Sequence, residues 1–363
     1  MDIVFLGPPC EAFADGARGS PTRQLAQALR RRGHPVLLLE QALSGSSWLE
    51  GEPARAPYLD VADLHARFRS RVRRADLVLV DADVPRGAEV GRWAQDTARG
   101  LTVCWDRDTP RTLRHARSRE DAARMTPELL AGYPLLLCSS GGPVPERLER
   151  EWGVARARVF PPGVPQEHFA PRAREPRWDL GHLGPSSAER RTLLGRLLLD
   201  AARDWPEGRF VLAGGMSVVD AAWPANVTRQ AAPPSREHPD FHAAQRFTLA
   251  LSRAEHTPGP HLFEAAACGA ALVCEPWPGL EDLFSLGEEV LVARTAKDVL
   301  LYLREMPEAD RLQLGARARE RVLAEHTVDQ RALALERYAD EAVRGASVGA
   351  PVRDTDPLER SLS

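Results

Sequence analysis

The chain has 363 residues, 43% of them apolar and 27% charged, and its formal net charge is −3 at pH 7. This length suits about two domains, and the near balance of charge gives no general reason to expect nucleic acid or an anionic membrane as a partner. No apolar run approaches the roughly 20 residues that span a bilayer, so we expect no integral membrane segment. The five cysteines form no C-x-x-C pair, which argues against structural zinc and favours a reduced, cytoplasmic protein.

The first half of the chain alternates short apolar runs with segments of helical period. This alternation is typical of parallel sheets wound with helices. Strands are expected near residues 3–6, 35–39, 76–81, 101–105, 134–139 and 157–160.

A long loop follows the first of these strands. Ser20 and Pro21 are a favourable cap and first residue for a helix, and Gly33 is a favourable stop. The loop before this helix is then about 13 residues long, against a usual length of about 2 to 6. We expect the loop to line a site, although a plain surface excursion would also explain it. Glu40 stands where a dinucleotide-binding domain keeps its ribose acid, but the glycines of the loop do not form G-x-G-x-x-G.

The second half repeats the plan after a connector with five prolines between Pro161 and Pro176. Strands are expected near residues 178–183, 209–213, 226–230, 246–251, 270–274 and 289–293. We therefore predict an α/β fold of two Rossmann-like, doubly wound domains facing a cleft, where ligands bind at the carboxyl ends of the strands. The expected divisions are an N-terminal domain (1–165), a linker (166–177), a C-terminal domain (178–325), a terminal helix (326–345) and a disordered tail (346–363).

The start of the second domain suggests a phosphate site. The segment "WDLGHLGPSSAERR" passes from a strand through Gly184 and Ser186 into a helix that carries Arg190 in its first turns. The free N–H groups of a helix start suit a phosphate, and arginine adds a second contact. Simple serine capping would also explain the pattern. Arg253, after the strand "RFTLAL", is expected at the cleft edge, with a solvent-facing arginine as the alternative.

Glu264 lies in the segment "HLFEAAACGAALV", in or just past the first turn of a helix that Pro258 and Pro260 precede and Gly269 closes. An acid is favoured near a helix start by the macrodipole alone. A carboxylate beside the small residues of "AAACG" would also suit a sugar diol, because it accepts hydrogen bonds where the backbone comes close to a ligand.

The segment "HLFEAAACG" resembles nucleotide-sugar glycosyltransferases of the GT-B fold, and the chain looks closest to the branch similar to the spore maturation protein CgeB. The likeness continues in "WDRDTPRTL", "CSSGGPVPERLEREWG", "WDLGHLGPSSAERR", "RFTLALSR" and "WPGLEDLF", in that order along the chain. The resemblance implies that Glu264 binds the ribose hydroxyls of the donor and that Asp106 and Asp108 face the cleft from the acceptor side. The donor-binding residues that we expect are Gly16, Gly184, Ser186, Arg190, Gly214, Arg253, His261, Glu264, Gly279, Leu280 and Glu281.

Three departures from the family pattern bear on catalysis. Many retaining relatives have a second glutamate where this chain has His256, and the CgeB-like sequences usually have arginine where it has His261. The first loop lacks the histidine often found there and offers Glu11 and Asp15 instead. These departures leave the stereochemistry and the catalytic base open.

The expected function is transfer of a sugar from a nucleotide diphosphate sugar, of UDP or TDP type, without a cofactor or a required metal. The acceptor, a small molecule, glycan or peptide, would give its proton to Asp106, Asp108 or Asp15 if the reaction inverts. A metal-dependent transferase would instead use Asp81–Asp83 or Asp106–Asp108 as an Asp-x-Asp pair. A nucleotide-sugar 2-epimerase and a binding or scaffold protein with a degenerate site also stay open.

Overall fold

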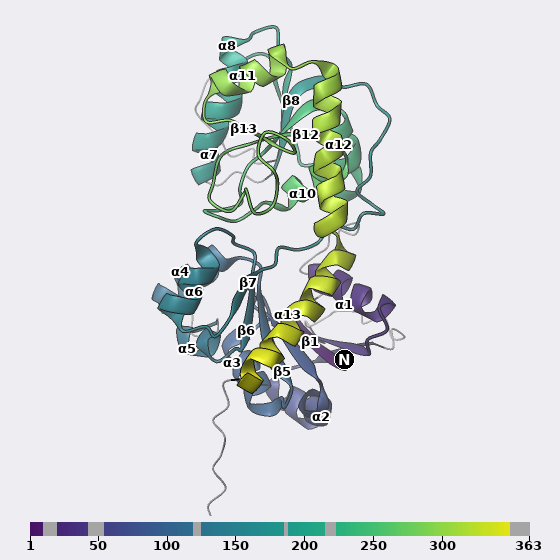
Figure 1. Cartoon of the computed structure of the whole chain (residues 1–363), viewed down its shortest axis with the longest axis vertical. Coiled ribbons are helices and arrows are strands. Elements are labelled where there is room, and N and C mark those ends of the chain that lie inside the picture. The colour runs from purple at the N-terminus through teal and green to yellow at the C-terminus, as the bar shows by residue number, and fades with distance from the viewer. Residues whose placement is uncertain (10–19, 43–53, 119–124, 185–187, 215–222, 349–363) are drawn as a thin grey trace, which may run out of the picture.

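The computed structural model describes residues 1–9, 20–42, 54–118, 125–184, 188–214 and 223–348. Two α/β domains follow one another along the long axis of the molecule, with the N-terminal domain below the C-terminal one in Figure 1. Each domain is built on its own parallel sheet, so the predicted fold of two doubly wound domains is confirmed. None of the described helices is both long and apolar enough to cross a membrane.

The N-terminal sheet has the strand order β3-β2-β1-β4-β5-β6-β7. Its strands are β1 (Ile3–Gly7), β2 (Val36–Gln41), β3 (Arg55–Tyr58), β4 (Leu77–Asp81), β5 (Leu101–Asp106), β6 (Leu135–Cys138) and β7 (Ala157–Val159). Six of them match the expected strands. The sequence did not predict β3, because it is a short edge strand that contains Pro57 and buries only Tyr58.

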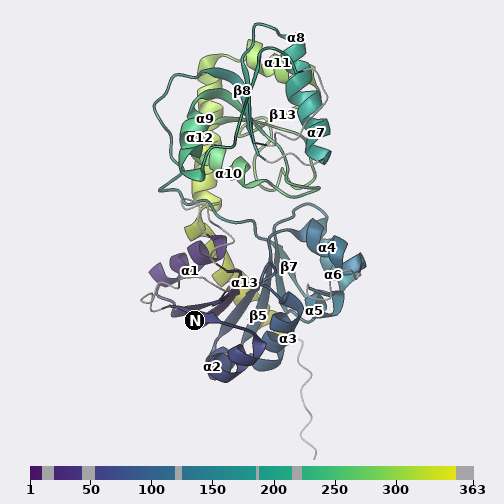
Figure 2. The ribbon, with the colours of Figure 1, turned by 180° about the vertical axis from the view of Figure 1, so that it is seen from behind.

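Helices cover both faces of this sheet. They are α1 (Pro21–Arg31), α2 (Val61–Arg74), α3 (Gly87–Thr97), α4 (Thr109–Ser118), α5 (Pro127–Ala131), α6 (Val144–Trp152) and α13 (Val328–Val348). Alternate residues of β4 face opposite sides: Val78 and Val80 pack in the core beneath α2 and α3, while Leu77 and Leu79 pack beneath α1 and α13. Figure 2 shows the side that carries α2, α3 and α5. Burial on both faces explains why the central strands are continuously apolar.

The C-terminal sheet has the order β10-β9-β8-β11-β12-β13. Its strands are β8 (Trp178–Leu183), β9 (Phe210–Ala213), β10 (Val227–Gln230), β11 (Gln245–Ala250), β12 (Ala271–Cys274) and β13 (Leu291–Val292). Its helices are α7 (Ala188–Leu194), a π-helical turn η2 (Gly195–Leu199), α8 (Asp200–Asp204), a 3₁₀ turn η3 (Ser235–Glu237), α9 (His238–Ala243), α10 (Pro260–Ala267), α11 (Ala296–Glu305) and α12 (Glu308–Glu325). All six strands lie at the expected places.

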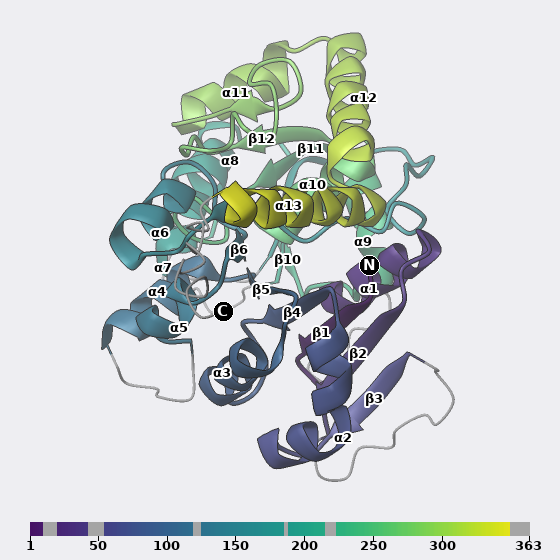
Figure 3. The same cartoon turned by 60° about the horizontal axis from the view of Figure 1, so that its bottom comes forward.

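The last helix returns to the N-terminal domain. Apolar residues of α13 such as Leu335 join the core formed by β1 and α1, and Figure 3 shows α13 lengthwise beside α1. Arg32 of the α1 end binds Glu336 of α13 through Nε and Nη2. The expected break near His326 is confirmed. The helix continues to Val348, however, so residues 346–348, expected in the tail, are helical, and 349–363 lie outside the described residues.

The two crossings between the domains run side by side. Val164 of the proline-rich connector donates its N–H to the His326 carbonyl oxygen at 2.9 Å, and its own carbonyl accepts from the Val328 N–H at 3.1 Å. A Cβ at Gly163 would lie 2.7 Å from the Thr327 carbonyl oxygen, so the close approach requires glycine there. The connector and the α12–α13 junction therefore form one paired crossing.

Candidate functional site

The carboxyl ends of the strands in the two domains face each other. The loop after β6 meets the turn after β11: Ser140 Oγ lies 2.6 Å from Thr257 Oγ1, and the Gly141 N–H donates to the His256 carbonyl oxygen at 2.8 Å. Gly279, whose φ is +107°, comes so close to Gly142 that a Cβ would lie 2.4 Å from the Gly142 nitrogen. These contacts close one side of an interdomain crevice, the position predicted for the site.

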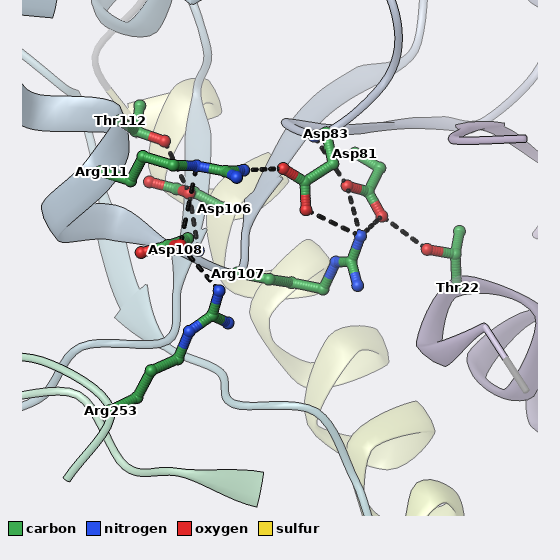
Figure 4. Close-up of polar contacts among 9 residues, drawn as sticks. All are labelled: Thr22, Asp81, Asp83, Asp106, Arg107, Asp108, Arg111, Thr112 and Arg253. Atoms are coloured by element: carbon green, nitrogen blue, oxygen red, sulfur yellow. Dashed lines mark hydrogen bonds and ion pairs between the residues drawn. The ribbon is translucent and has the colours of Figure 1, made fainter. Parts of the chain in front are cut away.

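A network of acids and arginines lines the N-terminal side of the crevice (Figure 4). Asp81, at the end of β4, accepts from Thr22 Oγ1 of α1 at 2.6 Å and from Arg107 Nη2 at 3.2 Å. Arg107 also binds Asp83 at 3.0 Å, and Arg111 of α4 pairs with the same carboxylate. Arginines therefore occupy the Asp81–Asp83 pair that an Asp-x-Asp metal site would need.

Asp106 ends β5 and is buried. Its Oδ1 accepts from the Asp108 N–H at 3.1 Å and from Thr112 Oγ1 at 3.0 Å. Burial raises the pKa of Asp106 from its ordinary 3.8 to about 7, against the lowering effect of these two hydrogen bonds. A carboxyl group with such a pKa can exchange a proton near neutral pH.

Asp108 and Arg253 join the two domains. Arg253 Nη2, from the segment after β11, donates to Asp108 Oδ2 at 2.7 Å across the crevice (Figure 4). Arg111 Nε lies 3.6 Å from the same oxygen. The structure thus brings together a residue expected to act as base and one expected to bind phosphate.

Glu264 is buried in α10, just past its first turn as expected, and two histidines bind it. Its Oε2 lies 2.9 Å from Nδ1 of His261 and 3.2 Å from Nδ1 of His238, which comes from α9. These three residues could also hold a metal ion, because their ligand atoms lie within 4.8 Å of one another. His238 was missed in the sequence, since nothing in the segment "EHPDFH" links it to a carboxylate 26 residues later.

Arg190, Gly184 and Gly214 lie together near the carboxyl ends of β8 and β9. Nε of the buried Arg190 donates to the Ser252 carbonyl oxygen at 2.8 Å. A Cβ on Gly214, with φ of +82°, would lie 2.9 Å from the Gly184 carbonyl oxygen, so the ends of β8 and β9 approach closely. His182, unnoticed in the sequence, lies beside Gly184 with its pKa lowered to about 3 by burial. The expected Ser186 lies outside the described residues.

The remaining expected residues do not gather at one place in the structure. The Gly279 N–H donates to Oε2 of Glu281 at 3.1 Å within its own turn, and Leu280 is fully buried in the core. Asp15 and Gly16 lie outside the described residues. Glu40 is buried and bound by Arg23 and Arg55, so it serves an ion-pair cluster of α1, β2 and β3.

A cavity of about 510 Å³ opens between the domains. It is lined by Thr109, Pro110, Leu113, Arg114, Ser140, Val144, Arg147, Ala254, Glu255 and His256. A smaller cavity of about 40 Å³ lies where Glu264 faces the start of α1 and the connector. The larger cavity is of a size that suits a small ligand.

Comparison with known proteins identifies the fold. The structure resembles sucrose-phosphate synthase from Thermosynechococcus elongatus, with 16% identity, 95% of this chain and 100% of that chain covered, and a TM-score of 0.67. It also resembles HepE of Anabaena in complex with UDP (15%, 94% and 100%, TM-score 0.67). An α-glucosyltransferase in complex with UDP and a 13-mer DNA is similar too (13%, 94% and 99%, TM-score 0.64).

No curated protein matches the sequence. Residues 190–337, however, match the model of a glycosyl transferase-like family. The match covers α7 to α13 and therefore includes Arg190, Arg253 and Glu264. The chain has the GT-B fold, and its C-terminal part matches a glycosyl transferase-like family, in line with the expected class of enzyme.

Proposed function

We propose that this protein transfers a sugar from a nucleoside diphosphate sugar, of UDP or TDP type, to a hydroxyl group of an acceptor in the interdomain crevice. The observation that carries the proposal is the convergence of Glu264, Arg190 and Arg253 on the crevice, at the carboxyl ends of the C-terminal strands. The presence of UDP in two of the similar structures supports it. We also propose that the chain belongs to the CgeB-like branch of these enzymes.

Each of these residues has a distinct role in the proposal. The Glu264 carboxylate would accept hydrogen bonds from the ribose hydroxyls, with its position set by His238 and His261. Arg190 and Arg253 would bind the diphosphate, where negative charge grows as the bond to the sugar breaks. The close backbone approach at Gly184 and Gly214 would let the donor lie near the strand ends.

We propose that the reaction needs no metal. The arginine partners of Asp81, Asp83 and Asp108 support this proposal, because positive side chains already occupy the carboxylates that an Asp-x-Asp site would use. We also expect no nucleic acid partner, because the chain is slightly acidic overall. The departures from the family pattern at His256 and His261 keep a second candidate open: a nucleotide-sugar-binding protein without turnover.

The test is thermal stabilisation of the full chain by UDP, TDP, GDP, ADP, CMP and NAD, each with magnesium and with EDTA. A shift with one nucleoside diphosphate that persists in EDTA supports the proposal and names the base of the donor. A shift that needs metal would contradict metal independence. No shift with any diphosphate would contradict the proposal.

Turnover separates the candidates that share donor binding. Release of UDP or TDP that depends on an added acceptor supports the transferase. Epimerisation of the sugar without acceptor would point to the 2-epimerase. Binding without turnover across many acceptors would favour the binding protein.

A further inference from the structure

His256 lies in a turn at a backbone position with positive φ, which is uncommon for residues other than glycine. Residues 254–257 form a four-residue turn between β11 and α10, closed by the Thr257 N–H donating to the Ala254 carbonyl oxygen at 3.0 Å. His256 has φ of +58° at the third position, whereas Glu255 has no positive φ, which makes this a type II turn. That position favours glycine or asparagine, and histidine adopts it less readily than glycine does. The backbone conformation of His256 is therefore a defined feature of this turn.

The turn is fixed against the other domain. The His256 carbonyl accepts from the Gly141 N–H, and the Thr257 hydroxyl contacts Ser140. The ring is also held, because Nδ1 lies 3.2 Å from the Pro278 carbonyl oxygen and the side chain is only 11% exposed. His256 is thus placed by the same contacts that close the crevice.

The contact with Pro278 indicates which nitrogen of the ring donates. A carbonyl oxygen only accepts, so Nδ1 carries the proton in the bond to Pro278, and the neutral ring then has its lone pair on Nε2. No described residue makes a hydrogen bond to Nε2. The carboxylate of Glu255, which is 84% exposed, lies 3.3 Å away from Nε2.

This pair lines the cavity of about 510 Å³ between the domains. Leu113 and Val144 give the cavity apolar surface, and Arg114 adds a cation without a carboxylate partner among the described residues. The volume suits an acceptor of about the size of a sugar. A bound hydroxyl group would thus find an imidazole with an accepting nitrogen in the wall of its pocket.

We propose that His256 is the general base of the transfer reaction. This inference rests on the function proposed above. The acceptor oxygen forms a bond to the anomeric carbon, the bond from that carbon to the diphosphate oxygen breaks, and the nucleoside diphosphate leaves with the electron pair. The acceptor proton moves to Nε2, and the imidazolium returns it to water after the product leaves.

The aspartates near the crevice suit this step less well. Asp106 is buried, and its Oδ1 already accepts from the Asp108 N–H and the Thr112 hydroxyl. Asp108 is paired with Arg253 and lies close to Arg111, so cations compete with a proton for its oxygens. Nε2 of His256 accepts no hydrogen bond from a described residue, and the charged group beside it is the carboxylate of Glu255 rather than a cation.

The test uses the full chain and a UDP-sugar such as UDP-glucose, or the TDP-sugar if screening names TDP, with water as acceptor and release of the diphosphate as readout. His256→Asn keeps a residue that tolerates the left-handed conformation, so we expect the fold and the UDP affinity to persist. We expect kcat to fall at least about 100-fold, the size of a general-base contribution. His256→Gly should be similarly inactive, and added imidazole should restore its rate at least about tenfold.

Arg86→Asn is the matched control, because Arg86 is the other described non-glycine residue with positive φ and lies at the start of α3. Its rate should stay within about twofold of the wild type. A His256→Asn rate within threefold of the wild type, or a His256→Gly variant that imidazole does not accelerate, would overturn the inference while leaving the transferase in place. A wild-type protein that neither binds nor turns over a nucleotide sugar would overturn the proposed function, and this inference with it.

Discussion

The charged groups on the two edges of the crevice have different kinds of partners. On the N-terminal edge, four aspartates (Asp81, Asp83, Asp106 and Asp108) face two arginines of the same domain, Arg107 and Arg111. On the C-terminal edge, two histidines bind the carboxylate of Glu264, and Arg190 binds a backbone carbonyl. Figure 4 shows that Arg253 crosses from the second edge to the first.

This difference indicates a division of labour. The charges of the acidic edge cancel only when Arg253 is counted and Asp106 is protonated. Three carboxylates then face three guanidinium groups. On the C-terminal edge, the Glu264 carboxylate is instead paired with side chains that can be neutral. We infer that the first edge is mainly a structural network and that the second is built to receive a polar ligand.

The largest effect should follow removal of Asp81, the centre of the structural network. Asp81→Ala leaves the buried guanidinium of Arg107 without its most buried partner, and Thr22 without an acceptor. We expect the free energy of unfolding to fall by about 3 to 5 kcal/mol, as for other broken buried pairs. Urea denaturation measures this free energy.

Asp96→Ala, at an exposed position of α3, is the control and should change stability by less than about 0.5 kcal/mol. A loss of the same small size at Asp81 would show that the network is not structural.

A second effect concerns Asp106 and pH. The folded protein holds the pKa at about 7 against an ordinary value of 3.8, so between these pH values it binds one more proton than the unfolded chain. The contribution of Asp106 to stability is therefore full below about pH 4 and is lost as the pH rises toward 7, by at most about 1.4 kcal/mol per unit. Asp106→Asn keeps an accepting oxygen but cannot titrate.

The measurement is urea denaturation of both proteins from pH 4 to 8. Relative to the wild type, Asp106→Asn should gain about 2 to 4 kcal/mol across this window, because only the wild type loses the bound proton. The difference between the two proteins removes the contribution of other titrating groups. A constant difference across the window would show that Asp106 has an ordinary pKa.

The strands of both sheets were largely predictable, because central parallel strands are buried on both faces and leave continuous apolar runs. The edge strand β3 was not, since Pro57 and one buried tyrosine give no such run. The sequence also did not predict that α13 packs against the first domain. The apolar face around Leu335 predicts a packed helix but does not name the sheet that it covers.

The site shows the same limit. The segment around Glu264 predicted the start of a helix, and the structure has Glu264 just past the first turn of α10. Its partner His238 belongs to another helix, and the Arg253–Asp108 pair joins residues 145 positions apart. Such contacts depend on how strands are ordered and domains are stacked. Local patterns identify the elements of a site, whereas the pairing of their side chains needs the tertiary structure.

A third effect tests the ligand-receiving edge. Glu264→Ala should weaken binding of UDP, or of TDP if screening names it, by ~1.5 to 3 kcal/mol if the carboxylate makes charge-assisted bonds to the ribose. Calorimetry with UDP and 2′-deoxy-UDP sharpens the result, because the variant should also lose the preference for the 2′-hydroxyl. Equal affinity in the folded variant would remove Glu264 from the donor site.

The smallest effect should come from the contact between the edges. Arg253 is 45% exposed and Asp108 14%, so their ion pair lies partly in water and its coupling energy should be only about 0.5 to 1 kcal/mol. A double-mutant cycle of Arg253→Gln and Asp108→Asn, followed by urea denaturation, measures this coupling.

Measured again with saturating UDP, the cycle tests the division of labour directly. If the diphosphate binds Arg253, the guanidinium must share or leave Asp108, and the coupling should approach zero. Coupling that UDP leaves unchanged would mean that Arg253 belongs to the structural network and that Arg190 must bind the diphosphate without it.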